Sequence, residues 1–287
     1  MEFHTLITTA QLSRVLSSNT LVIVDCRFDL AETGSGQKKY LNSHIPGAAY
    51  CHLDNDLCGP IIPGTTGRHP LPDVDKLVEK FSSWGIDDQT QVVVYDDSEP
   101  ATGAIASRLW WSLRWLRHEA VALLDGGWQA WVAENRPVEV GQCINPMKTF
   151  IAHPRNELIV VSSVVEDTRL DPNFRLLDSR TRDRYEGLNE TIDPVAGHIP
   201  GALPLPYIEN VDPEGKFLSA EQLEARFKDV LGDIPAQNVV FYCGSGVTAA
   251  HNLLAYKHAG LGDAQLYVGS WSDWIIDPAR PVATGDT

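Results

Sequence analysis

Val-Val-Phe-Tyr-Cys-Gly-Ser-Gly-Val-Thr-Ala, at residues 239–249, changes character twice. It begins as a continuous apolar run, typical of a parallel strand buried on both faces, and Cys243 stands where that run ends. Two glycines then predict a tight loop, and a helical pattern follows from Ala249 to Ala259, with Gly260 as its stop. A strand that leads through a loop into a helix predicts an α/β fold with a parallel sheet.

The landmarks around this stretch occur twice, in the same order. They are Asp-x-Arg at Asp25 and Asp178, His-Ile-Pro-Gly-Ala at His44 and His198, the strand ends Tyr95 and Tyr242, and the Trp pairs Trp128/Trp131 and Trp271/Trp274. Such self-similarity predicts a duplicated domain of about 140 residues. We therefore expect a first domain over 1–139, a linker over 140–154 and a second domain over 155–287.

Both halves alternate apolar runs with helical patterns, such as 219–231, which Ser219 caps with Gln222 three residues on. The prediction is two tandem domains, each a parallel sheet with helices on both faces. Reactive groups in such sheets gather at the carboxyl ends of the strands. The duplicated His44, His198 and Trp residues are expected to be structural, because they occur in both halves.

Composition excludes several classes of function. The chain has 287 residues and a formal net charge of −15, which argues against a general nucleic-acid binder or a protein held to anionic lipid. The N-terminus lacks a basic stretch followed by an apolar one, so we expect no signal peptide. No apolar run approaches the roughly 18 residues of a membrane span, so we expect no membrane segment.

The five cysteines form no Cys-x-x-Cys pair, which favours free thiols in a reducing cytoplasm over a disulfide framework. Cys26 and Cys143 are expected to fill space. Cys51 and Cys58 could pair or bind a metal, but nothing nearby completes a ligand set, so neither a metal nor another cofactor is predicted.

Cys243 is the candidate nucleophile. The loop amides of Gly244, Gly246, Val247 and Thr248 can turn inward, and the following helix adds its positive end, so the arrangement favours a thiolate. A buried structural cysteine is the alternative. The first half has Asp96 at the matching position, with further acidic residues after it, and is expected to be catalytically inactive while completing a cleft at the domain interface.

The repeat, the Cys-Gly-Ser-Gly-Val-Thr-Ala loop, both His-Ile-Pro-Gly-Ala segments and Gly-Ser-Trp-Ser-Asp-Trp at 269–274 resemble the two-domain sulfurtransferases, rhodanese and mercaptopyruvate sulfurtransferase. The resemblance covers essentially the whole chain. It implies an inactive first domain, a persulfide on Cys243, and transfer of sulfur to cyanide, a small thiol or reduced thioredoxin.

The resemblance also implies roles for other residues. Arg184, in Arg-Tyr-Glu-Gly, would bind the donor's anionic group, for which a planar guanidinium is suited, and a surface salt bridge is the alternative. Ser245 would handle protons with His69 and Asp54, which would have to come from the first half. Asp178 would orient neighbouring arginines, and Arg180 and Arg182 are further candidates near the donor.

The chain departs from the family pattern at the donor site. Thiosulfate-type loops carry basic residues after the cysteine, whereas Gly244 and Ser245 stand here, which favours mercaptopyruvate. Yet 186–197 contains no Lys or Arg, so the second arginine of mercaptopyruvate-type members is missing unless Arg180, Arg182 or Arg68 substitutes. Thiosulfate therefore stays open as the donor.

Other classes fit the loop less well. A cysteine phosphatase needs an arginine six residues after its cysteine, where Ala249 stands. A serine hydrolase built on Ser245 lacks the first glycine of its Gly-x-Ser-x-Gly turn, because Cys243 occupies that place. A non-enzymatic persulfide carrier would have the same loop and stays open.

Overall fold

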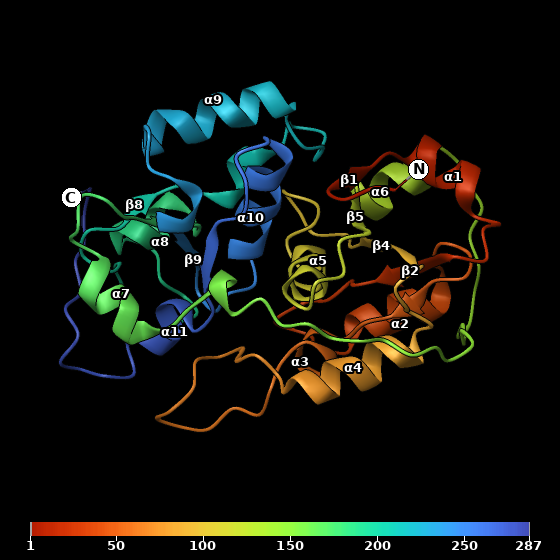
Figure 1. Ribbon diagram of the computed structural model, residues 1–287, viewed down its shortest axis with the longest axis horizontal. Helices are drawn as coiled ribbons and strands as arrows, with labels where there is room; N and C mark the ends of the chain where they lie inside the picture. The colour runs from red at the N-terminus through yellow and green to blue at the C-terminus, as the bar shows by residue number, and fades with distance from the viewer. Residues whose placement is uncertain (1, 287) are drawn as a thin grey trace. The chain divides into compact units, whose positions relative to one another are not determined.

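The computed structural model describes residues 2–286 (Figure 1) and divides into two compact units. The first comprises the chain up to Gly59, Pro72–Arg155 and Pro213–Phe217; the second comprises Pro60–Leu71, Asn156–Asp212 and the chain from Leu218. The units thus differ from the continuous domains expected above, because two short segments group with the opposite unit. That grouping depends on contacts between residues that are distant in sequence, and local sequence patterns do not predict such contacts.

The first unit is built on a five-stranded sheet in the order β1-β5-β4-β2-β3, with every neighbouring pair parallel. Its strands are β1 (Leu6–Ile7), β2 (Leu21–Asp25), β3 (Ala49–Tyr50), β4 (Gln91–Tyr95) and β5 (Val121–Leu124). Its helices are α1 (Thr9–Val15), α2 (Ser35–Asn42), α3 (Leu53–Asp56), α4 (Val74–Ser83), α5 (Ala106–Trp115) and α6 (Gly127–Ala133).

The second unit repeats this topology as β6-β10-β9-β7-β8, again all parallel. Its strands are β6 (Ile159–Val160), β7 (Arg175–Asp178), β8 (Leu203–Pro204), β9 (Val239–Tyr242) and β10 (Gln265–Tyr267). Its helices are α7 (Ser162–Thr168), α8 (Arg182–Glu186), α9 (Ala220–Leu231), α10 (Ala249–His258) and α11 (Ser270–Trp274), with short turns η1 (Asn156–Leu158), η2 (Tyr207–Asn210) and η3 (Ala236–Asn238). The predicted duplication and α/β fold are confirmed.

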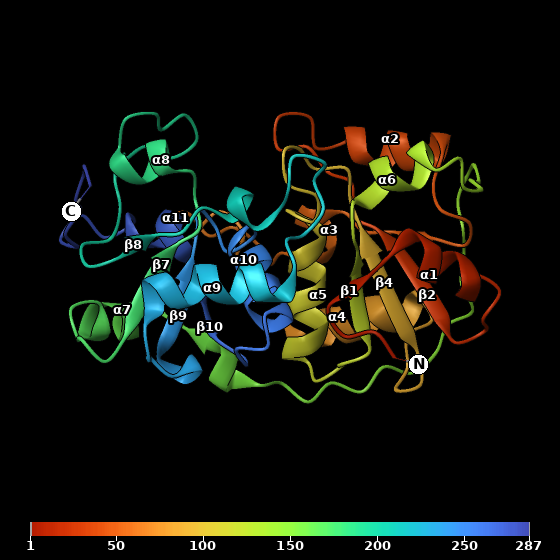
Figure 2. The ribbon, with the colours of Figure 1, turned by 90° about the horizontal axis from the view of Figure 1, so that it is seen from above.

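Helices cover both faces of each sheet because the connections run in both directions along it. The chain moves one way along the sheet from β1 to β2 to β3 and the other way from β3 to β4 to β5, and right-handed crossovers then place the helices on opposite faces. In Figure 2, α5 and α1 lie on opposite sides of β4 and β2. The predicted capping box at the start of α9 is also present, with Ser219 and Gln222 bonding reciprocally.

Each sheet carries the same buried ion pair at the end of the strand between its central strand and its edge, β2 in the first unit and β7 in the second. Arg180 binds both carboxylate oxygens of Asp178, and Arg27 binds Asp25 in the same way. The two guanidinium groups also stack on Trp271 and Trp128, at 4.8 and 4.4 Å. The pair occurs in both units, which favours a structural role at the strand end, while the predicted role of Asp178 in orienting arginines near the donor stays a prediction.

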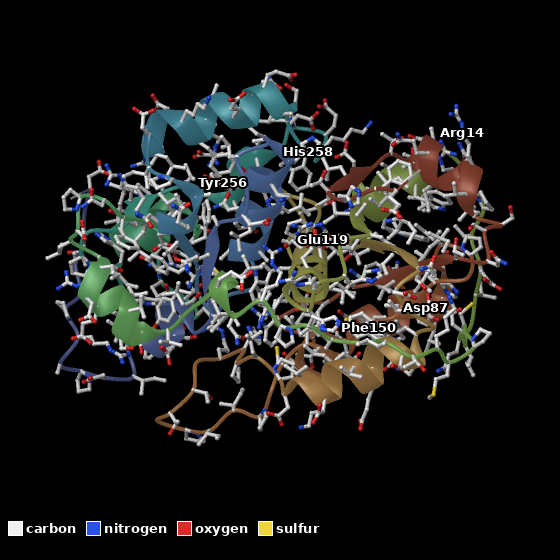
Figure 3. All side chains as sticks on the ribbon, viewed as in Figure 1. Arg14, Asp87, Glu119, Phe150, Tyr256 and His258 are labelled. Carbon is white, nitrogen blue, oxygen red and sulfur yellow. The ribbon has the colours of Figure 1, made fainter. Side chains whose placement is uncertain are left out.

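The segment predicted as a linker has no helix or strand over 140–154 and groups with the first unit. Phe150, labelled in Figure 3, is buried edge-on against Phe81 at 5.1 Å. Lys148 forms an ion pair with Asp87 at 3.1 Å, and Asp87 is labelled in the same figure. The segment is therefore anchored along the unit it leaves. No helix within residues 2–286 is long and apolar enough to span a membrane.

Candidate active site

Cys243 follows β9 directly, and its backbone is fixed on both sides. Its N–H donates to Ser270 Oγ at 3.1 Å, and its carbonyl accepts from Trp271 N–H at 3.0 Å. The Gly246 N–H donates to the sulfur at 3.2 Å. The predicted inward-turned loop is thus present at this amide, and α10 starts six residues after the cysteine, at Ala249. The sulfur therefore accepts one backbone hydrogen bond in the turn between β9 and α10.

Ser245 and His69 lie together, as the resemblance implies. His69 Nδ1 is 2.7 Å from Ser245 Oγ, and both residues are buried. The histidine belongs to the segment Pro60–Leu71, which is part of the second unit. An imidazole bonded to a hydroxyl can pass a proton near neutral pH. Asp54 lies in α3 of the first unit, and its predicted role beside His69 stays a prediction.

Two arginines approach the loop at Gly244. A Cβ placed on this glycine would lie 2.9 Å from Arg68 Nη2 and 3.6 Å from Arg184 Nη2, so the missing side chain makes room for both guanidinium groups. Asp193 bridges the arginines by accepting from Arg68 Nη1 and, at 3.0 Å, from Arg184 Nη2. The buried Nε of Arg68 has no hydrogen-bond partner among the described residues. The pair therefore forms an anion site with a carboxylate of the chain in it.

Glu190 supports this arrangement from behind. It accepts from Arg184 at 2.9 Å and from the N–H groups of Ile192 and Asp193. Burial alone would raise the pKa of Glu190, but the two backbone donors and Arg184 outweigh it and lower the pKa below its ordinary value. Asp193 and Glu190 are not among the site residues predicted from the sequence. The signal was present, since the stretch that lacks the family's second arginine contains these two acids.

The other predicted donor-site residues are engaged elsewhere. Asp178 and Arg180 are buried in the pair described above, and Arg180 also donates to the Gly197 carbonyl at 2.6 Å. Burial alone would lower the pKa of Arg180, but Asp178 raises it. Arg182 is exposed and pairs with Asp286 at 2.9 Å. These contacts favour structural roles, which leaves Arg68 and Arg184 as the candidates for binding a donor.

Asp96 occupies the position of Cys243 in the first unit and fills the corresponding loop with a carboxylate. It accepts from the N–H groups of Gly103, Ile105 and Ala106 at 2.7–2.9 Å, and from Ser98 at 3.2 Å. Burial raises the pKa of Asp96, and these backbone donors oppose that rise. The loop holds an anion but has no nucleophile.

Comparison with known proteins agrees with this architecture. The rhodanese-like domain family matches residues 8–134 and again 163–277. The chain is 45% identical to a "Probable 3-mercaptopyruvate sulfurtransferase" of Pseudomonas aeruginosa over 98% of both proteins, and 30% identical to the thiosulfate sulfurtransferase of Rattus norvegicus over 95% of this chain and 92% of that protein. The structure is similar to the crystal structure of SseA from Escherichia coli, a 3-mercaptopyruvate sulfurtransferase, with a TM-score of 0.78. The two sequences are 27% identical, and the match covers 94% of this chain and all of SseA. The chain therefore belongs to the two-domain sulfurtransferases of the rhodanese-like family.

Proposed function

We propose that this sulfurtransferase takes sulfur from 3-mercaptopyruvate, holds it as a persulfide on Cys243 and passes it to a thiol or to cyanide. The observation that carries the proposal is the position of the Arg68–Arg184 pair beside Gly244, next to the cysteine. Two guanidinium groups fit a carboxylate donor, and the loop itself carries no basic residue that would favour thiosulfate. The similar proteins include enzymes named for each donor.

Donor binding would exchange one carboxylate for another. The donor's carboxylate takes the place of Asp193 between Arg68 and Arg184, and the unpartnered Arg68 Nε supplies a further N–H. Arg68 thereby substitutes for the second arginine missing from 186–197. Because Asp193 already neutralises the pair, a donor must compete with it for the arginines.

In the first half-reaction, the Cys243 thiolate attacks the donor sulfur. A sulfur–sulfur bond forms and the sulfur–methylene bond breaks, and its electron pair moves into the enolate of pyruvate. The enolate takes one proton, giving Cys243–S–SH and pyruvate. Ser245 is placed to deliver that proton and His69 to replace it, since they are 2.7 Å apart.

In the second half-reaction, an acceptor removes the outer sulfur. A thiolate leaves as its persulfide, cyanide leaves as thiocyanate, and a reduced dithiol such as thioredoxin leaves as its disulfide with release of hydrogen sulfide. Cys243 returns as a thiolate each time. The first unit takes no chemical part, because Asp96 stands where the nucleophile would be. All five cysteines are free thiols, which supports a cytoplasmic location for the enzyme, because thiols stay reduced there.

The test is intact-mass spectrometry after donor treatment, combined with kcat/KM for both donors. We expect one added sulfur atom on Cys243 and a kcat/KM for mercaptopyruvate above that for thiosulfate, with cyanide as the common acceptor. A thiosulfate preference would overturn the donor assignment but not the persulfide. A persulfide without steady-state turnover would identify a carrier, and turnover without a sulfur adduct would exclude the mechanism.

A further inference from the structure

The first unit contains a cluster of potential metal ligands that sulfur transfer does not use. It consists of His44, Glu139 and Cys143, whose ligand atoms all lie within 4.8 Å of one another. The Cys143 sulfur is 3.5 Å from Glu139 Oε2, and His44 Nε2 is 4.0 Å from the same oxygen. We propose that this cluster is a zinc-binding site.

The histidine is prepared for a metal. His44 Nδ1 lies 2.8 Å from the Tyr40 carbonyl oxygen, which can only accept, so Nδ1 carries a proton and Nε2 is the nitrogen that offers a lone pair in the neutral ring. His44 is fully buried, and its Nε2 has no hydrogen-bond partner within residues 2–286. Metal-binding histidines characteristically donate their other N–H to a carbonyl or carboxylate in this way.

The other two ligands are held to the histidine by the backbone. Glu139 and His44 exchange both backbone hydrogen bonds, at 2.8 and 2.9 Å. The Cys143 N–H donates to the Tyr40 hydroxyl at 2.9 Å, and the Tyr40 ring stacks on His44. Three ligand types therefore converge because one short segment, 139–143, is fixed against the His-Ile-Pro-Gly-Ala segment.

The chemistry of this set favours zinc. Thiolate, neutral imidazole and carboxylate are the common zinc ligands, and three protein ligands leave the fourth position of the tetrahedron to water. Tetrahedral zinc places such ligand atoms roughly 3.4–3.6 Å apart, from its usual bond lengths. The sulfur–oxygen distance of 3.5 Å already fits, and the longer separations, up to 4.8 Å, need a closure of roughly 1.2 Å at most by the loop that contains Gly141.

Charge at the site also suits a dication. Glu139 Oε2 accepts from the Gly47 N–H at 2.8 Å and from the Cys143 thiol at 3.5 Å, and both hydrogen bonds stabilise an ionised carboxylate. Cys143 is the donor in the second bond, so it faces Glu139 as a thiol. Zinc would displace its proton, so that the bound site carries Cys143 as thiolate and releases one proton to solvent.

The second unit provides an internal control. His198 has the same surroundings as His44: its Nδ1 lies 2.8 Å from the Tyr185 carbonyl, its ring stacks on Tyr185, and its backbone pairs with Ala283. Alanine at 283 offers no ligand where Glu139 does. The fold therefore has the histidine in both units, and within residues 2–286 a carboxylate and a thiol join it in the first unit alone.

The test is zinc binding to the full chain in a Cys243→Ser background, which removes the thiol of the active loop as a competitor for metal. Titration against a chromogenic chelator should give one zinc per chain, and Co²⁺ should give the charge-transfer and visible bands of a tetrahedral thiolate site. Cys143→Ser and Glu139→Ala, the latter copying Ala283, should weaken zinc binding by more than about 100-fold, beyond the 10–100-fold typical of outer-shell changes.

Cys58→Ser is the matched control, because it removes a free thiol outside the cluster and should leave the affinity unchanged. Zinc should also raise the unfolding midpoint of the parent and not of Glu139→Ala, and should slow alkylation of Cys143. Either of two results would overturn the site: no zinc bound at micromolar concentration, or a cobalt thiolate band that survives Cys143→Ser.

Discussion

The loop after β4 and the loop after β9 occupy the same place in two copies of one fold, yet they treat negative charge differently. In the first, the Asp96 carboxylate sits permanently on four backbone N–H groups. In the second, a sulfur takes the Gly246 N–H, and the chain's carboxylate lies instead on the side chains of Arg68 and Arg184. A carboxylate on guanidinium groups can be exchanged for a donor, whereas one enclosed by backbone cannot.

The residues that hold the two loops in place also differ at one position, where the first unit has Gly127 and the second has Ser270. Gly127 and Ser270 both have left-handed backbone, with φ of 56° and 55°, and each precedes the tryptophan whose N–H reaches the loop. Glycine adopts this conformation without strain, but for serine it costs about 1–3 kcal/mol. The second unit accepts this cost where the Ser270 hydroxyl binds the Cys243 N–H. Strain is therefore kept beside the loop that contains Cys243.

Replacing the nucleophile by the first unit's residue should have the largest effect. Cys243→Asp should lower turnover about 10⁴–10⁶-fold, as expected for loss of a covalent nucleophile. Its unfolding midpoint should stay close to the parent value, because the carboxylate can use the loop amides as Asp96 does. The reciprocal control, Asp96→Asn, should retain kcat and lose about 1–3 kcal/mol of stability, since some buried donors lose their partner. Activity loss in Asp96→Asn would place chemistry in the first loop as well.

Removing one arginine of the pair should come next in size. Arg184→Gln should lower kcat/KM for mercaptopyruvate about 10–100-fold, the range expected for charged hydrogen bonds. Transfer from a preformed persulfide to a thiol should be unchanged, because the donor has already left. Arg182→Gln is the matched control, since Arg182 is exposed and pairs with Asp286. Equal losses in both variants would indicate a general charge effect instead of a binding contact.

Removing the chain's own carboxylate should act in the opposite direction. Asp193→Asn should lower KM for mercaptopyruvate by about 3–10-fold at unchanged kcat, because the donor no longer competes for the arginines. Single-turnover kinetics of persulfide formation over a range of donor concentrations measure this directly. If KM rises instead, Asp193 positions the arginines for the donor and does not compete with it.

Exchanging the strained support should have a smaller effect with a distinctive signature. Ser270→Gly and Ser270→Ala both lose the hydroxyl, so persulfide formation should slow severalfold in each because the Cys243 N–H loses its acceptor. Ser270→Ala also keeps the strain, so Ser270→Gly should be the more stable of the two by about 1 kcal/mol. Chemical denaturation and single-turnover rates separate the two effects, and a Ser270→Gly variant with unchanged rate would remove the positioning role.

The two loops also show how far the sequence could lead. The repeated landmarks were sufficient for the duplicated α/β fold, because strand ends and helix caps are local patterns, and they placed Cys243 at a strand end. His69 beside Ser245 came from resemblance alone. Asp193 between Arg68 and Arg184 could not be predicted, since it depends on segment 60–71 belonging to the second unit, a contact distant in sequence. The sequence shows that an acidic residue, Asp96, stands at the position of Cys243, but it does not predict that four backbone N–H groups donate to that carboxylate.

The smallest expected effect concerns Glu190, which holds Arg184 and the Asp193 backbone. Because its pKa is lower in the folded chain than its ordinary value, Glu190 contributes stability that is fully present above about pH 4.3, the unfolded pKa of glutamate, and is lost as pH falls through the folded value. Glu190→Gln should therefore be less stable than the parent at neutral pH, and the difference in unfolding free energy should shrink as the pH is lowered. Denaturation series at several pH values measure this difference. A difference that stays constant from neutral to acid pH would mean that Glu190 acts through shape and hydrogen bonding alone. Asp193 would then balance the charges of the arginine pair without a contribution from the charge of Glu190.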